Sequence, residues 1–518
     1  MNQVGGGTRP ERRGGAGSTW LGLRPGTLLA LVAIAGLLIP LSALSQPADS
    51  SSPGGKLARL RTASGLAQAN LGDVDPTGEA MRLATLGLKN VAVTLLWDRA
   101  NHYKMVEDWT NLSAVVEQLT KLQPHFFPVW DFQSHNLSYN VSVEFDDYHD
   151  RYAWVMKGLE FLRQGIALNR HEPRLLGRMG WVIGHKIGRS DEKKQFRRLF
   201  KADDDFHDRD DPDRTLPERD CWLVSRQKHL AAQRLADSGA PLKTTALIFH
   251  SHPMMATISY ARGLQEDGTF GAAARDAWRL AGEEMTRYAM REIPTSWDVP
   301  IRLGLREDEL ARGQRAATEL EQLLPGRFAA LEQRLRDGLS DAQKQALAVP
   351  PLERSEPQQQ LAAAAEAALK VTWPMVAREA PPDVRAKAQE LARRFVEAEE
   401  TAEIIDRYRD IVNFDFWRAA CEAEVTPPAL LAREKIWEAD REFEAARLQS
   451  ARKAYEEAFA AWRQVLDASP VLRRDQLQAQ DTRDVVDRYR RLLEQLDEPF
   501  PQPFVLQDVL DLAGPSLD

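Results

Sequence analysis

Apolar residues recur every three or four positions over most of the chain, as in ELARGQRAATELEQLL and FAALEQRLRDGL within residues 301–345. This spacing places the apolar side chains on one face of a helix. Runs that alternate between apolar and polar residues, which are typical of strands, are rare. We therefore predict an all-α body with fewer than about a tenth of its ordered residues in strands.

Internal repeats within this pattern are similar to the tetratricopeptide motif, in which small residues let paired helices approach closely. The first unit carries Ala100, and a shift of 34 residues leads to Ser134. A second shift of 34, with an insertion of 12, leads to Gly180, and a fourth unit carries Ala261. We predict that Gly180 lies where the two helices of the third hairpin touch, so that leucine there is destabilising and alanine close to neutral. The alternative is an irregular helical bundle with chance matches.

The units are interrupted by two insertions, residues 138–150 and 189–219. Near the C-terminus, Pro427-Pro428 is predicted to be the turn of an antiparallel hairpin between helices over 382–417 and 428–468. The predicted organisation is a disordered basic N-terminus (1–26), a transmembrane or signal segment (27–44), a linker (45–60), a tetratricopeptide-like repeat domain (61–293), a helical connector with a Pro-rich break (301–380) and a C-terminal helical hairpin domain or bundle (382–518).

No charged residue occurs between Pro25 and Ala48, and Thr27–Leu44 is almost wholly apolar. A helix that spans a membrane needs about 20 apolar residues, with a lower limit of about 17. Four arginines precede the segment, which predicts a single-pass anchor in the cytoplasmic membrane with the body on the periplasmic side. The alternative is a signal peptide cleaved near Ser45, which would leave the protein secreted or periplasmic.

The composition excludes several classes of protein. Apolar residues make up 43% and charged residues 28% of the 518 positions, which is typical of a chain that forms a core. The formal net charge of −8 argues against a nucleic-acid binder. The two cysteines, Cys221 and Cys421, are too few and too far apart for a CxxC motif or a four-thiolate cluster.

All ten histidines lie between His102 and His252, which raises the hypothesis of a metal site. HSHP, at residues 250–253, resembles the metal-binding motif of zinc-dependent isopeptidases. Such a motif also needs a serine and an aspartate downstream, but Tyr260 and Gly263 stand at those positions. The match fails, and we expect a loop there with a helix that begins at Pro253.

The acidic run over 203–213 has enough carboxylates to bind Ca²⁺ or Mg²⁺, but it lacks the glycine of an EF-hand loop. We expect a solvated, mobile loop at this place. A basic strip over 186–198 is expected to pair with these acids.

The first insertion combines aromatic residues with carboxylates and amides, a composition suited to a peptide or sugar surface. Loops that interrupt a repeat are often binding elements. The alternative is that Tyr139 and Phe145 only pack against neighbouring hairpins. The candidate binding residues are Asn136, Tyr139, Asn140, Asp146, Asp147, Arg151 and Lys186.

Four segments between residues 95 and 210 resemble a family of large planctomycete bacterial proteins: LWDRANHYKMVEDWTNLSAVVEQLTKLQPHF, VWDFQSHNLSYNVSVEFDDYHDRYAWV, HEPRLLGRMGWVIGHKIGRSDEKKQFRRLFK and DDDFH. The resemblance extends over roughly residues 55–510 and implies a membrane-associated, tetratricopeptide-like protein. It implies no activity, so no catalytic residue follows from it.

From these observations we expect a non-catalytic, membrane-anchored helical-repeat scaffold that presents a protein- or peptide-binding surface outside the cytoplasmic membrane. No cofactor, no bound metal and no nucleic-acid partner are expected. The alternative is a metal-dependent hydrolase that uses the His/Asp-rich region 102–252. The Gly-rich phosphate loop, G-x-S-x-G and H-E-x-x-H motifs do not occur in the sequence.

Overall fold

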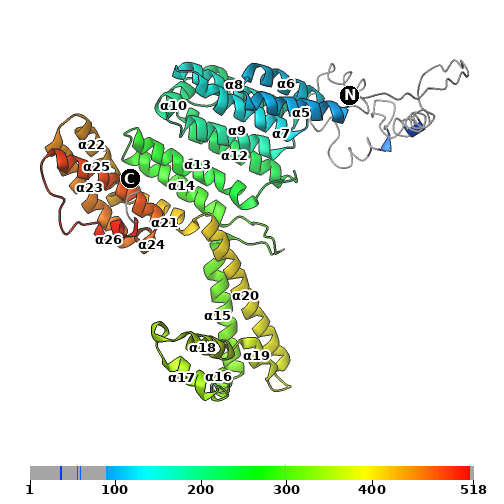
Figure 1. Cartoon of the computed structure of the whole chain (residues 1–518), viewed down its shortest axis with the longest axis vertical. Helices are drawn as coiled ribbons and strands as arrows, with labels where there is room; N and C mark the ends of the chain where they lie inside the picture. Colours follow the sequence, from blue (N-terminus) through cyan, green and yellow to red (C-terminus); the bar gives the residue numbers. More distant parts are fainter. Residues whose placement is uncertain (1–35, 38–54, 57–58, 60–88, 298, 514–518) are drawn as a thin grey trace, which may run out of the picture. The chain divides into compact units, whose positions relative to one another are not determined.

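The computed structural model describes residues 36–37, 55–56, 59, 89–297 and 299–513 (Figure 1). Over these residues the regular elements are helices, and the one strand-like contact is an isolated antiparallel bridge between Ile293 and Ile301. The prediction of an all-α body is confirmed for this part of the chain.

The chain divides into two units, Met1–Lys89 with Ala167–His171 and Asn90–Ile166 with Glu172–Asp518. Apart from Gly36 and Leu37, the predicted transmembrane or signal segment 27–44 lies outside the described residues. None of the helices in the described part combines the length and the apolar character that crossing a bilayer requires.

The residues of the four predicted repeat units lie on four pairs of helices in contact. That these pairs are tetratricopeptide-like repeats stays a prediction. The facing sides of the paired helices carry the apolar residues of the 3–4 pattern, which is why each helix packs against its partner. The pairs are α5 (Lys89–Met105) with α6 (Trp109–Leu122), α7 (Phe127–His135) with α8 (Tyr148–Leu168), α9 (Pro173–Val182) with α12 (Cys221–Asp237), and α13 (Ala246–Glu266) with α14 (Ala272–Ala289).

Small residues lie where paired helices touch. A Cβ atom at Gly158 of α8 would come within 2.9 Å of the carbonyl oxygen of Ser134 in α7. A Cβ atom at Gly180 of α9 would come within 2.9 Å of the carbonyl oxygen of Ser225 in α12. The Ser225 hydroxyl also donates a hydrogen bond of 2.7 Å to the Gly180 carbonyl. Gly180 therefore lies at a helix contact, where the repeat pattern places a small residue.

Short elements fill the two inserted segments. A π-helical turn, η1 (Asn136–Asn140), and a 3-10 turn, η2 (Val141–Glu144), follow α7. A second π-helical turn follows α9, and two further helices and a 3-10 turn lead to α12. These are η3 (Ile183–Ile187), α10 (Lys193–Lys201), α11 (Asp204–Asp210) and η4 (Pro217–Arg219).

The helix expected to begin at Pro253 begins at Ala246 instead, and Pro253 lies inside α13. Proline has no N–H to donate to the carbonyl of Phe249, so it disfavours a helix interior. The nearby carbonyl of His250 accepts a hydrogen bond of 3.2 Å from Gln233 Nε2 on α12. Most of α13 is buried, so packing against its neighbours outweighs the local preference of the proline.

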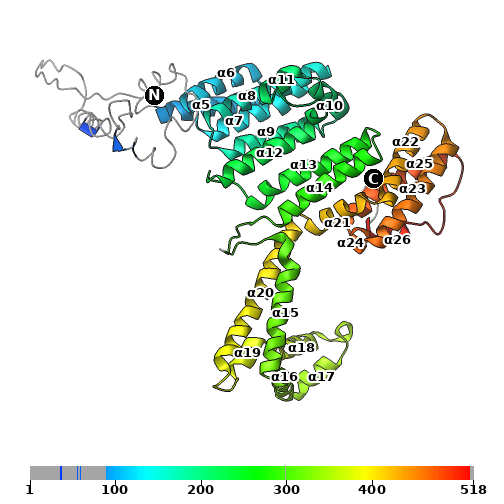
Figure 2. The ribbon, with the colours of Figure 1, turned by 180° about the vertical axis from the view of Figure 1, so that it is seen from behind.

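Helix α15 (Arg306–Leu323) lies along α20 (Arg385–Ile411), as both views show (Figures 1 and 2). Because α15 belongs to the predicted connector and α20 to the predicted C-terminal domain, the two predicted regions pack against each other here. A separate apolar core at its far end includes Leu320, Leu391 and Val376. The elements between the two helices are α16 (Arg327–Asp337), α17 (Asp341–Ala348), η6 (Pro351–Glu353), α18 (Glu356–Ala368) and α19 (Trp373–Arg378), and η5 (Leu303–Leu305) precedes α15.

The C-terminal hairpin consists of α22 (Pro427–Glu444) and α23 (Leu448–Ala468), not of the helices on either side of Pro427. The predicted helices over 382–417 and 428–468 are each interrupted, at Asn413 with φ 48° and at Ala446 with φ 56°. A positive φ cannot continue a right-handed helix. The remaining elements are α21 (Phe414–Glu424), α24 (Pro470–Arg474), α25 (Gln476–Gln495), α26 (Gln507–Leu510) and η7 (Asp511–Ala513).

One apolar core connects the fourth helical pair to the C-terminal elements. It contains Ile258 of α13, Trp278 of α14, Ile405 of α20, and Phe414 and Cys421 of α21, all buried. Helices α13, α14, α20 and α21 therefore form one packed body.

Candidate binding surface at two π-turns

Two π-helical turns, η1 and η3, extend the neighbouring helices α7 and α9. Turns of this kind are rare and are frequently found at functional sites. Cβ atoms at Gly184 in η3 and at Gly188, which follows it, would come within 2.8 and 2.5 Å of the Trp222 ring. The indole therefore packs directly on the backbone of the turn, which only glycine allows.

Four rings form one cluster, two from the turns η1 and η3 and two from the ends of α7 and α9. His135 stacks on Tyr139 with 4.6 Å between ring centroids, and Trp181 stacks on His185 at the same separation. The Tyr139 hydroxyl and His185 Nδ1 lie 3.1 Å apart and join the two stacks by a hydrogen bond. The surface made by His135, Tyr139, Trp181 and His185 is called the ring cluster below. His185 is exposed and the other three rings are partly exposed.

Basic side chains flank the ring cluster. The Arg178 guanidinium lies 4.8 Å from the centroid of a Trp181 ring and forms an ion pair with Asp131. Burial and the charge of Arg178 lower the pKa of His135, and burial with the charge of Arg189 lowers the pKa of His185. Both imidazoles are therefore neutral near pH 7, and the cluster is suited to ring stacking and neutral hydrogen bonds.

The structure brings together five of the seven predicted binding residues. Tyr139 lies in the ring cluster, and Lys186 places Nζ 5.4 Å from its ring centroid. Asn140 Nδ2 donates a 3.0 Å hydrogen bond to Asn136 Oδ1. Arg151 forms an ion pair with Glu192, whose charge also acts on Lys186. Lys186 is only 6% exposed and Asn136 only 1%, so both support the cluster from below.

Asp146 and Asp147 are not part of this surface. Both are exposed. Asp147 precedes α8 and accepts hydrogen bonds from the backbone and the ring of His149 at 2.7 and 2.9 Å. Its carboxylate satisfies the free N–H groups of a helix N-terminus, which is a structural role.

Sequence reasoning missed His135, Arg178, Trp181 and His185, although the repeat register contains a signal for the three rings among them. The same shift of 46 residues that relates Ser134 to Gly180 also relates His135 to Trp181 and Tyr139 to His185. Each pair of rings is spaced i, i+4 on its own helix, so its members face each other.

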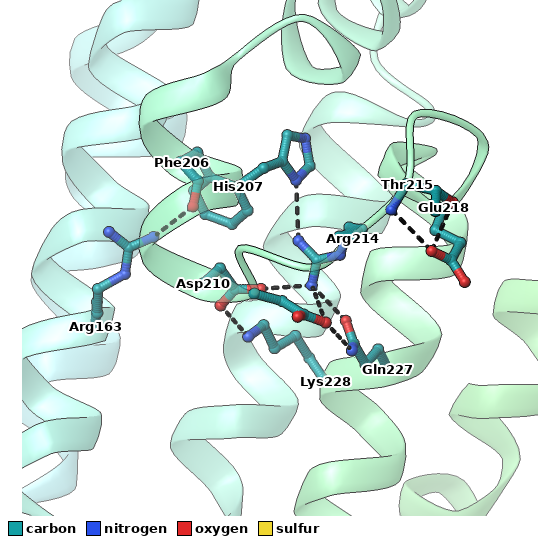
Figure 3. A network of polar contacts seen from close by, with 10 residues as sticks. Arg163, Phe206, His207, Asp210, Arg214, Thr215, Glu218, Gln227 and Lys228 are labelled. Atoms are coloured by element: carbon teal, nitrogen blue, oxygen red, sulfur yellow. Dashed lines mark hydrogen bonds and ion pairs between the residues drawn. The ribbon is translucent and has the colours of Figure 1, made fainter.

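The acidic run is a folded element, not the mobile loop that we expected. Asp203 caps α11 by accepting a 2.9 Å hydrogen bond from the Phe206 N–H. Asp210 forms ion pairs with Lys228 and with Arg214, whose guanidinium lies 2.7 Å away (Figure 3). Burial raises the pKa of Asp210, but these two cations outweigh the burial and hold that pKa below its usual value.

A buried histidine completes this network. Arg214 donates a 2.9 Å hydrogen bond to His207 Nδ1 (Figure 3). His207 Nε2 donates to the Phe200 carbonyl at 2.8 Å. Asp204, Asp205 and Asp208 also have arginine partners. These carboxylates are therefore used by the protein's own cations.

The basic strip has different partners from those expected. Lys193 and Arg197 of α10 both contact Glu266 on α13, at 3.0 and 3.3 Å. Arg197 also donates to the Gly188 carbonyl at 3.1 and 2.7 Å. Although the basic strip is close in sequence to the acidic run, its side chains connect α10 to α13 and not to that run.

The histidines of HSHP lie in the interior of a helix. His252 stacks on His229 of α12 with 4.6 Å between centroids, and burial lowers the pKa of both. Burial also lowers the pKa of His250 to about 4. Within the described residues, no group of three or more His, Cys, Asp or Glu side chains is placed to hold a metal ion.

Comparisons with known proteins found no matching family model, no matching curated protein and no matching solved structure. The planctomycete family resemblance therefore stays an expectation from the sequence.

Proposed function

We propose that this protein is a non-catalytic, tetratricopeptide-like helical-repeat scaffold that binds a protein or peptide partner through the ring cluster. The observation that carries this proposal is that consecutive hairpins present rings at equivalent repeat positions. In a helical-repeat array, equivalent positions of successive units line one continuous surface. Tyrosine, tryptophan and arginine are also the residues most enriched among binding hot spots.

The proposed partner is a peptide segment with an exposed apolar or aromatic side chain. Such a side chain would contact Trp181 and the exposed His185, and the neutral imidazoles impose no charge requirement on it. The buried Lys186 and Asn136 hold the turn in shape beneath the rings. A surface prepared in this way loses little conformational entropy on binding.

A selection of displayed peptides against the full chain tests the proposal. We expect the selected peptides to bind the Trp181→Ala variant about 30-fold more weakly, which corresponds to a hot spot of about 2 kcal/mol. The matched control is Trp297→Ala. Trp297 is 51% exposed and has the Arg407 guanidinium 5.6 Å from its ring, as Trp181 has Arg178.

The control variant should bind the peptides as the unmodified protein does. Two results contradict the proposal: that no peptide is enriched, or that the enriched peptides bind Trp181→Ala with unchanged affinity.

We further propose that residues 27–44 anchor the protein in the cytoplasmic membrane with its body outside. The uncharged segment and the four preceding arginines support this orientation. Membrane fractionation followed by N-terminal sequencing tests it. A soluble periplasmic protein that begins near Ser45 would support the cleaved signal peptide instead.

A further inference from the structure

A cavity of about 350 Å³ lies apart from the ring cluster, between α10, α12 and α13 on one side and α21 and α25 on the other. Its volume is in the range of sites for small molecules. The apolar core that contains Ile258 and Phe414 joins α13 to α21, so two opposite walls belong to one packed body.

The charges that line the cavity are unbalanced. Glu266 is shared between two cations, and Asp481 is the one other carboxylate in the lining. Among the residues that line the cavity, the four cations Arg189, Lys193, Arg197 and Arg262 outnumber Glu266 and Asp481, a formal excess of two positive charges. Outside the lining, Asp267 lies 3.9 Å from Arg197.

Arg262 has only one, distant carboxylate partner among the described residues. Its nearest carboxylate oxygen is Asp481 Oδ2 at 3.8 Å, and it makes no hydrogen bond to any described residue. Its guanidinium lies 5.2 Å from the centroid of a Trp417 ring. Burial and the charge of Arg433 lower the pKa of Arg262, and the charges of Asp481 and Glu424 offset this only in part.

Arg189 is also available for a ligand. It is exposed, forms no ion pair with a described residue, and lies 6.0 Å from a ring of Trp222. Two guanidinium groups next to tryptophan rings offer several N–H donors in planar arrangements, which suit phosphate oxygens.

Two residues with neutral donors line the same cavity. Ser259 is 8% exposed and its hydroxyl makes no hydrogen bond within the described part of the chain. Trp222 is 7% exposed and its indole N–H has no partner there either. The Ser259 hydroxyl is thus a donor on the cavity lining that is free for a bound ligand.

The walls also contain flat apolar surface. Trp222, Phe416 and Trp417 contribute rings, and Met255 and Leu477 contribute aliphatic surface. The ring of Trp222 is held in place because Gly184 and Gly188 allow it to pack on the backbone of η3. The cavity thus combines a cationic side with an apolar side.

We propose that this cavity binds a small phosphomonoester that carries an aromatic or other flat apolar group. A phosphate monoester has a charge of about −1.5 to −2 near pH 7, which matches the excess of two positive charges. Its oxygens accept hydrogen bonds from Arg262, Arg189 and Ser259, and its flat group contacts the tryptophan rings.

Isothermal titration of the full chain with phenyl phosphate tests this proposal. We expect saturable binding of phenyl phosphate, weaker binding of inorganic phosphate because it has no flat group, and no binding of phenol. Arg262→Gln should weaken the binding of phenyl phosphate by about tenfold or more. The control Arg441→Gln removes an exposed arginine 4.8 Å from a Trp437 ring, outside the cavity, and should leave the binding unchanged.

If Arg262→Gln does not fold, Arg189→Gln provides a second variant of the cavity. It should fold, because Arg189 is exposed and forms no ion pair that the substitution would remove. It should also weaken the binding of phenyl phosphate. The proposal is overturned if phenyl phosphate does not bind, if inorganic phosphate binds equally well, or if the cavity variants bind as tightly as Arg441→Gln. Trp181→Ala should not change this binding, so the phosphomonoester site and the peptide surface can fail independently.

Discussion

Gly180 provides the sharpest test of the helical pairing. A Cβ atom at this position would lie 2.9 Å from the Ser225 carbonyl oxygen and 3.0 Å from two ring atoms of His229. The first of these contacts is with the backbone of α12, which cannot move aside as a flexible side chain can. Any substitution therefore pushes α9 and α12 apart and lengthens the 2.7 Å hydrogen bond from Ser225 to Gly180.

The expected loss of stability follows from three contributions. Overpacking of a core costs about 1–3 kcal/mol, and a weakened buried hydrogen bond costs up to about 1 kcal/mol. Replacement of a helical glycine by alanine returns about 0.5–1 kcal/mol. Gly180→Ala should therefore destabilise the protein by about 1 kcal/mol, which corrects the near-neutral effect expected from the repeat pattern alone. Gly180→Leu should cost about 3 kcal/mol.

Differential scanning calorimetry of the full chain measures both variants. The matched control is Gly177→Ala in the same helix, because its Cβ atom would meet only Phe249, at an ordinary distance of 3.7 Å. This control should raise stability by about 0.5–1 kcal/mol. If Gly180→Ala is as stable as Gly177→Ala, the close contact between α9 and α12 is wrong. Amide hydrogen exchange should show the loss first in α9 and α12.

Three further outcomes are expected. Stability should fall as the pH drops below about 6.5, because burial lowers the pKa of His229 and His252 and the unfolded chain therefore binds more protons in that range. Thermal melts at pH 7.5 and 5.5 measure this loss of stability. His229→Gln should make the loss smaller. Gly282→Ala should raise the melting temperature, since no atom lies within 4 Å of the added Cβ atom, and a lower value contradicts the open helix face. Asp210→Asn should lower the free energy of unfolding by about 3 kcal/mol in denaturant titrations, because Lys228 and the buried Arg214 lose their carboxylate partner. An unchanged free energy of unfolding would show that these ion pairs contribute nothing to stability.

Several features of the candidate sites were already present in the sequence. The repeat register placed Ser134 and Gly180 at helix contacts, because a small residue at a fixed spacing reports how closely two helices pack. The first insertion was identified by its composition, and Tyr139 does lie in the ring cluster. His185 belongs to the same register, but a single histidine in a helix gives no local sign that it faces a tyrosine on another helix.

The sequence by itself determined that the described residues form helices, but it did not fix where each helix begins and ends. The spacing of apolar residues and the positions of turn residues are local properties, and they act within a few residues of chain. The spacing of small residues also indicated which helices pair, because such residues lie where two helices approach closely.

Only the tertiary structure decided the contacts between distant segments. It placed Pro253 inside a buried helix, paired α15 with α20, and brought Arg262 and Trp417 to one cavity. Each of these outcomes depends on how much apolar surface the whole arrangement buries and on which charges meet across it. Contacts between distant segments leave no periodic signal in the sequence, because an apolar face on one helix can pack against the apolar face of many other helices.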